Sequence, residues 1–192
     1  MKIGLFGGTF NPPHVGHLIV AEAVRDELDI EKIYFIPSFI SPHKQTGEED
    51  LSDHRLNMVT LAVKDNPHFE AVGIELERKN ISYTVDTLEE LHKKQPNNLF
   101  YLLIGMDNYA AFHTWKNVDR IFELSSLVVM NRPNFAPTLN PNLHSKKVCF
   151  ASVPNIELSS SELRERIIRG ESIKHQVPDP VLDYIQSHGL YK

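Results

Sequence analysis

The chain has 192 residues, of which 41% are hydrophobic and 23% charged, and its formal net charge is −5 at pH 7. This length suits one domain with a sizeable core, and the composition is typical of a globular protein rather than a disordered one. The negative charge argues against a nonspecific nucleic-acid binder, because such proteins carry clustered lysine and arginine and have a basic isoelectric point. Any site for an anionic ligand must therefore be local.

A lone cysteine, Cys149, excludes an internal disulfide bond. Its apolar neighbours Val148 and Phe150 favour a buried thiol on a strand over a nucleophile. No apolar run approaches the length needed to span a membrane, and none typical of a signal peptide follows Met1-Lys2. We therefore expect a soluble, cytoplasmic protein that binds neither membranes nor nucleic acid, and we leave homo-oligomer formation open.

Strand and helix patterns alternate along the chain. Apolar runs predict strands over 2–6, 32–36, 69–74, 99–104, 126–130 and 147–151. The run 99–104 is apolar throughout, so we expect it near the centre of the sheet. Helical spacing predicts helices that begin near residues 15, 52 and 84. This alternation predicts an α/β fold, a doubly wound, Rossmann-like parallel sheet in a single domain over residues 1–192, whose ligands bind beyond the carboxyl ends of the strands.

Two further helices are predicted near the C-terminus. Ser159 and Glu162 form a capping box at the start of the first, and Gly170 ends it. Asp179-Pro180 begins the second, which ends at Gly189. We expect these helices to form a small appendage on the sheet.

Two histidines follow the first predicted strand. Gly7-Gly8 lacks Cβ atoms, so its N–H groups can turn toward bound oxygens, and Pro12-Pro13 delays the helix. His14 and His17 then lie on one face of its first turn, beside four N–H groups without helical partners and the positive end of the helix dipole. This combination predicts a phosphate site. The alternatives are two solvated histidines, or a zinc site that would have only two ligands.

The segment from Gly8 to Leu18 is Gly-Thr-Phe-Asn-Pro-Pro-His-Val-Gly-His-Leu. It lacks the Gly-Lys-Ser/Thr that ends a Walker A loop, and it lacks the third glycine of a dinucleotide-binding fingerprint. It resembles the T/HxGH signature of the nucleotidyltransferase superfamily. The wider run GGTFNPPHVGHL is similar to the bacterial nicotinate mononucleotide adenylyltransferase branch, and the resemblance covers essentially the whole chain.

A second motif is Leu-Ser-Ser-Ser-Glu-Leu-Arg over residues 158–164. Serine hydroxyls and free N–H groups at a helix start, with Arg164 about one turn on, predict a second anion-binding helix end. The segment resembles the superfamily's (I/L)SSTxIR motif, with Ser161 in the threonine position and Leu163 in the isoleucine position. The alternative is an ordinary capped helix with a solvated arginine.

The two motifs contain no positioned nucleophile, which favours direct transfer of a nucleotidyl group over covalent catalysis. The resemblance implies that nicotinate mononucleotide attacks the α-phosphorus of ATP and that Mg²⁺ binds through the ATP phosphates, with no metal ligands from the protein. It implies a catalytic role for His14, His17, Arg164 and Lys44, although a solvated loop lysine is the alternative for Lys44. The ATP-binding residues that it implies are Gly7, Gly8, Thr9, Phe10, His17, Ile104, Gly105, Asp107, Ser159, Ser160 and Arg164.

Substrate choice needs further residues. Trp115 follows a predicted short helix and can offer a flat face to an aromatic ring, although core filling is the alternative. Tyr83-Thr84 begins a helix whose free amides can receive a carboxylate and would favour nicotinate over nicotinamide. Both segments resemble the nicotinate-recognition region of the bacterial enzymes, and Lys44 is a further candidate for binding the mononucleotide.

Other functions share parts of these motifs. Phosphopantetheine adenylyltransferases and cytidylyltransferases have the histidine motif but are usually shorter or lack the Tyr83-Thr84 and Trp115 segments. A class I aminoacyl-tRNA synthetase would need a KMSKS-like lysine pair and a basic surface, and neither is visible. A catalytically silent nucleotide sensor would lose one of the phosphate-stabilising side chains, yet His14, His17 and Arg164 are all present.

Overall fold

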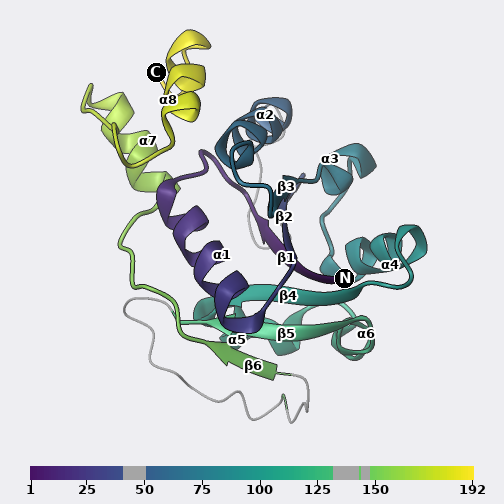
Figure 1. The fold of residues 1–192 in the computed structure, drawn as a ribbon. Helices are drawn as coiled ribbons and strands as arrows, with labels where there is room; N and C mark the ends of the chain where they lie inside the picture. The colour runs from purple at the N-terminus through teal and green to yellow at the C-terminus, as the bar shows by residue number, and fades with distance from the viewer. Residues whose placement is uncertain (41–50, 132–142, 144–147) are drawn as a thin grey trace.

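The computed structural model (Figure 1) describes residues 1–40, 51–131, 143 and 148–192. Within these residues six parallel strands form one sheet in the order β3-β2-β1-β4-β5-β6. The strands are β1 (Lys2–Gly8), β2 (Lys32–Pro37), β3 (Phe69–Ala71), β4 (Leu99–Gly105), β5 (Ser125–Met130) and β6 (Val148–Ala151). The strand order reverses between β1 and β4, and this switch point is where doubly wound sheets bind ligands.

Helices cover both faces of the sheet (Figure 1). They are α1 (Val15–Leu28), α2 (Ser52–Val63), α3 (Ile74–Arg78), α4 (Thr84–Lys94), α5 (Met106–Ala111), α6 (Val118–Leu124), α7 (Ser160–Ile168) and α8 (Asp179–Ser187), with a 3₁₀ turn, η2 (Phe112–Thr114), after α5. The α/β alternation predicted from the sequence is confirmed. The strand over 99–104 is central as predicted, because β4 pairs with both β1 and β5.

Two apolar clusters form the core, one on each face of the sheet. Phe35 of β2 packs with Ala21 and Val24 of α1, whereas its neighbour Ile36 belongs to the opposite cluster with Leu88 of α4. Successive residues of a strand point to opposite faces, so a strand that is covered on both faces must be apolar at every position. This requirement explains the unbroken apolar runs in the sequence.

Two local predictions need correction. The strand predicted over 69–74 ends at Ala71, and Ile74 instead begins α3, where its side chain is buried in the core. The strand is short because β3 lies at the edge of the sheet and pairs only with β2 among the described strands. Cys149 does lie on a strand, but β6 is the other edge of the sheet and the residue is only half-buried.

The two C-terminal helices do not pack on the sheet as expected. Leu163 of α7 and Val181 and Ile185 of α8 pack around Met58 of α2, in a third apolar cluster. Figure 1 shows α7 and α8 beyond α2, at the end of the sheet where β1 leads into α1. The appendage thereby brings the start of α7 against the loop after β1. None of the described helices is both long and apolar enough for a transmembrane segment.

Candidate active site

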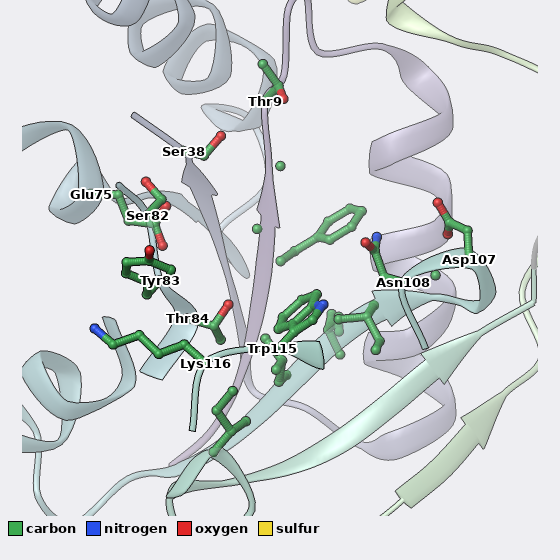
Figure 2. Close-up of a pocket in the computed structure, with 18 of the residues that line it drawn as sticks. Thr9, Ser38, Glu75, Ser82, Tyr83, Thr84, Asp107, Asn108, Trp115 and Lys116 are labelled. Atoms are coloured by element: carbon green, nitrogen blue, oxygen red, sulfur yellow. The ribbon is translucent and has the colours of Figure 1, made fainter. Parts of the chain in front are cut away.

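Two cavities adjoin at the carboxyl ends of β1 and β4. Cavity A, of about 510 Å³, is lined by residues that include Glu75, Ser82, Tyr83, Thr84, Trp115 and Lys116 (Figure 2). Cavity B, of about 370 Å³, is lined by residues that include His14, His17, Ser159, Ser160, Ser161 and Arg164. Both cavities share Phe6, Thr9, Gly105, Asp107 and Asn108. Ligands in the two cavities would therefore meet along a common wall.

His14 and His17 form a stacked pair at the start of α1. Their ring centroids lie 3.6 Å apart at an interplanar angle of 21°. The backbone N–H of His14 donates a hydrogen bond to Nδ1 of His17 at 3.1 Å. Since this nitrogen accepts, the neutral ring of His17 carries its proton on Nε2. The ring of His17 is thus available as a donor through Nε2.

Burial keeps both rings neutral. It lowers the pKa of His14 from 6.5 to about 4. Burial, followed by the proximity of His14, lowers the pKa of His17 well below its usual value. An anion in cavity B would oppose this effect, because a nearby negative charge favours the protonated form of an imidazole.

The start of α1 offers fewer free donors than the sequence predicts. The N–H of Val15 donates to the carbonyl of Gln176 at 3.0 Å, and that of His17 donates to the carbonyl of His14 at 3.0 Å. Together with the N–H of His14, which donates to Nδ1 of His17, three of the four expected amides are therefore engaged. The tertiary contact from Gln176 has no signal in the sequence near the motif.

The structure brings the second motif onto the first. Ser159 caps α7 as predicted, because its Oγ accepts from the N–H of Glu162 at 3.2 Å. The hydroxyl of Ser160 donates to the carbonyl of Pro12 at 2.8 Å. Arg164 donates from Nη1 to the carbonyl of Asn11 at 2.8 Å, so its guanidinium lies beside the loop after β1.

Cavity A contains the residues expected to choose the substrate. Tyr83 is the N-cap of α4 and Thr84 is its first residue. Within the part of the chain that the structure describes, the N–H of Thr84 donates no hydrogen bond. Figure 2 shows Tyr83, Thr84 and Trp115 among the side chains that line this cavity. The Trp115 ring also packs on Phe112, with centroids 4.8 Å apart, so it both lines the cavity and fills the core.

The remaining predicted residues lie at the strand ends. Ile104 lines cavity A, Phe10 lines cavity B, and Thr9, Gly105 and Asp107 line both. A Cβ at residue 105 would lie 2.6 Å from Oδ1 of Asp107, which explains the glycine there. Two further predicted residues, Gly7 and Gly8, line cavity A at the end of β1, and a Cβ at Gly7 would meet no atom within 4 Å. Lys44 lies outside the described residues.

Sequence reasoning missed two buried charged residues. Arg55 of α2 is fully buried and donates hydrogen bonds to three backbone carbonyls around the site. Glu75 lines cavity A, accepts from the Thr87 hydroxyl at 2.7 Å, and has its pKa raised by burial. A signal for Arg55 was present, because it occurs at helical spacing with Met58 and Val59, on the buried side of α2.

Comparisons with known proteins show the family to which the chain belongs. Residues 5–166 match the family model described as cytidylyltransferase-like. A probable nicotinate-nucleotide adenylyltransferase of Salinibacter ruber is 40% identical over 192 residues, which cover 100% of this chain and 98% of the relative. The one of Geobacillus thermodenitrificans is 43% identical over 191 residues, covering 99% of this chain and 86% of the relative.

Solved structures agree on the fold. Plasmodium falciparum nicotinic acid mononucleotide adenylyltransferase complexed with NaAD superposes with a TM-score of 0.78 at 22% identity, covering 99% of this chain and 97% of that one. The fold and the two motifs thus define a nucleotidyltransferase of the cytidylyltransferase-like class. Within that class, the chain belongs to the nicotinate-nucleotide adenylyltransferase family.

The lowered pKa of His14 predicts a pH-dependent stability. Between pH 6.5 and about 4 the unfolded chain binds a proton at His14 that the native state does not. The free energy of unfolding should therefore decrease as the pH falls through this window. Denaturant unfolding at a series of pH values, for the wild type and for His14→Gln, tests this. The glutamine variant should lose less stability on acidification; equal pH dependence of the two proteins would contradict the prediction.

Proposed function

We propose that this chain transfers the adenylyl group of ATP to nicotinate mononucleotide, giving deamido-NAD and pyrophosphate. The observation that carries the proposal is the common wall of cavities A and B at the switch point of the sheet. Two substrates held in these cavities would meet at that wall, as direct transfer requires. The curated relatives are named nicotinate-nucleotide adenylyltransferases, and the Plasmodium structure holds NaAD, which supports the same reaction here.

In this proposal the phosphates of ATP occupy cavity B, and the rest of the nucleotide extends along the common wall to Gly7, Gly8 and Ile104 at the edge of cavity A. A phosphate oxygen of the mononucleotide attacks the α-phosphorus, the bond from that phosphorus to the β-phosphate oxygen breaks, and pyrophosphate leaves. His14, His17 and Arg164 stabilise the negative charge that develops on the phosphates. Lys44 is proposed to assist them.

Backbone and strand-end groups hold the rest of ATP. The N–H groups of the loop after β1 and the start of α7 face the phosphates, and the end of β4 holds adenosine. The proposed ATP-binding set is Gly7, Gly8, Thr9, Phe10, His17, Ile104, Gly105, Asp107, Ser159, Ser160 and Arg164. All of these residues lie in one domain, which we assign to residues 1–192.

The donors in cavity B suit phosphate better than a resident metal ion. Two imidazoles and a guanidinium bind phosphate oxygens, whereas Mg²⁺ prefers oxygen ligands. Asp107 is the only carboxylate among the described residues that line this cavity. We infer that Mg²⁺ enters on the ATP phosphates, where it neutralises charge, and that Asp107 is the protein group able to contribute to holding it.

Nicotinate mononucleotide occupies cavity A. The Trp115 ring stacks on the pyridine ring, and the N–H groups that begin α4 at Thr84 receive its carboxylate. Such donors match a carboxylate but are mismatched with the NH₂ of an amide. Tyr83, whose ring lies 4.3 Å from the Lys116 ammonium, forms the adjoining wall, and Lys44 is proposed to reach the mononucleotide phosphate.

A pyrophosphate-release assay with ATP and Mg²⁺ tests the proposed reaction. Nicotinate mononucleotide should give rapid release together with deamido-NAD, nicotinamide mononucleotide should give slower release, and phosphopantetheine should give none. Release with phosphopantetheine, or with CTP in place of ATP, would assign the chain to another member of the class. An absence of release with every acceptor would indicate a nucleotide sensor.

His17→Ala tests the role of the imidazole donor. The variant should fold and bind the mononucleotide but turn over about 10²–10³ times more slowly, because the lost donor acts mainly in the transition state. The exposed His68, which bonds to the carbonyl of Glu31 away from both cavities, provides the control His68→Ala. Turnover of His17→Ala close to that of His68→Ala would remove His17 from the mechanism.

Trp115→Ala and Thr84→Pro separate stacking from carboxylate recognition. Trp115→Ala should weaken both mononucleotides alike, by roughly 1–3 kcal/mol, because stacking does not distinguish an acid from an amide. Thr84→Pro removes one N–H at the first position of a helix, where proline is tolerated, and should reduce the preference for the acid. The measurement is the ratio of kcat/KM for the two mononucleotides. If Trp115→Ala instead abolishes the preference, the carboxylate site lies elsewhere.

A further inference from the structure

Arg55 connects the loops that form the walls of both cavities. Its Nη1 donates to the carbonyls of Thr9 at 3.0 Å and Ser38 at 2.6 Å, and its Nη2 donates to the carbonyl of Phe39 at 3.4 Å. Thr9 lines both cavities and Ser38 lines cavity A, whereas Arg55 is not among the described residues lining either. The guanidinium therefore holds residues of the cavity walls without lining a cavity itself.

The bond to Thr9 sets the direction of one peptide group. In a trans peptide the C=O and the following N–H point in opposite directions. The carbonyl of Thr9 points toward Arg55, which lines neither cavity, so the N–H of Phe10 points to the opposite side, and Phe10 itself lines cavity B. Within the described residues this N–H donates no hydrogen bond. It is therefore available to a phosphate oxygen.

The conformation of Phe10 requires such support. Its φ of 50° lies in the left-handed region, where the Cβ of a bulky residue comes too close to the following carbonyl oxygen. Its ring is held by burial, with centroids 5.0 Å from that of His17 and 5.8 Å from that of Phe35. Arg55 holds the Thr9–Phe10 peptide group, which precedes the Cα of Phe10, through its bond to the Thr9 carbonyl. Strain of this kind persists only where the surroundings fix it, and it is frequent at functional sites.

The same guanidinium fixes residues 38–40, the described part of the loop after β2. These residues accept hydrogen bonds from Arg55 and are also bonded to Ser82. The N–H of Phe39 donates to Oγ of Ser82 at 2.9 Å, and the N–H of Ser82 donates to the carbonyl of Ile40 at 2.9 Å. Ser82 directly precedes the Tyr83-Thr84 wall of cavity A. A continuous set of hydrogen bonds thus joins the two cavities through Arg55.

The geometry points to Arg55 as a positioning residue for adenylyl transfer: its guanidinium fixes the loops after β1 and β2 so that the Phe10 N–H faces the phosphates. This inference rests on the proposed function, because it requires phosphates in the cavities. Lysine keeps the charge but lacks the planar fork that reaches several carbonyls at once. Arg55→Lys should therefore misplace these loops while keeping a buried cation.

The test compares Arg55→Lys with the control Arg25→Lys. Arg25 is a partly buried arginine of α1 that pairs with Glu22 at 2.7 Å and lines neither cavity. The assay is run below the melting temperatures of the wild type and both variants. Arg55→Lys should lower kcat/KM roughly 10²-fold, and Arg25→Lys should match the wild type. Arg55→Lys should also weaken the binding of ATP and pyrophosphate but leave the affinity for adenosine unchanged. A merely structural role would lower the melting temperature without this difference between ligands.

A measurement on the wild type covers the case in which Arg55→Lys does not fold. The backbone amide resonance of Phe10 should shift on addition of ATP or pyrophosphate and should not shift with adenosine. An unresponsive amide, or an Arg55→Lys variant with the kinetics of Arg25→Lys, would overturn the inference. A wild type that releases no pyrophosphate would instead overturn the proposed function, so the two failures are distinguishable.

Discussion

The arrangement of the site depends on how the loop after β1 is held. Three of its carbonyls accept hydrogen bonds from two helices: Thr9 from Arg55 of α2, Asn11 from Arg164 of α7, and Pro12 from Ser160 of α7. The side chain of Asn11 accepts a further hydrogen bond from the Tyr191 hydroxyl near the end of the chain. Because buried backbone oxygens must be paired, these bonds stabilise one loop conformation. Of the three peptide groups, only Thr9–Phe10 has an N–H to offer, since prolines follow Asn11 and Pro12.

This constraint explains the position of the C-terminal helices. Packing of α7 and α8 on α2 buries a separate apolar cluster, so the appendage is held independently of the sheet. Its geometry places two α7 groups, Ser160 and Arg164, against a loop that is about 150 residues away in the sequence. We therefore regard the appendage as part of the proposed phosphate site rather than an addition to the fold.

The histidine pair couples electrostatics to ligand binding. Stacked and buried, His14 and His17 have lowered pKa values because desolvation disfavours their charged forms. A polyphosphate would supply the negative charge that the free site lacks and would raise both pKa values. The protonation of the two rings therefore responds to the ligand.

The sequence by itself determined the elements, and it named most of the candidate residues that the structure brings to the two cavities. Apolar periodicity located the strands because a doubly covered sheet requires apolar residues at every position, and Gly, Pro and His spacing located the loop after β1. It failed where distant contacts decide the outcome, as in the early end of β3 and the exposure of Cys149, both consequences of edge positions. Only the tertiary structure revealed that α7 and α8 pack on α2 and that Arg55 joins two loops. It also revealed that the carbonyl of Gln176 accepts a hydrogen bond from the first N–H of α1. These features depend on contacts between residues that are far apart in the sequence, and local sequence patterns carry no information about such contacts.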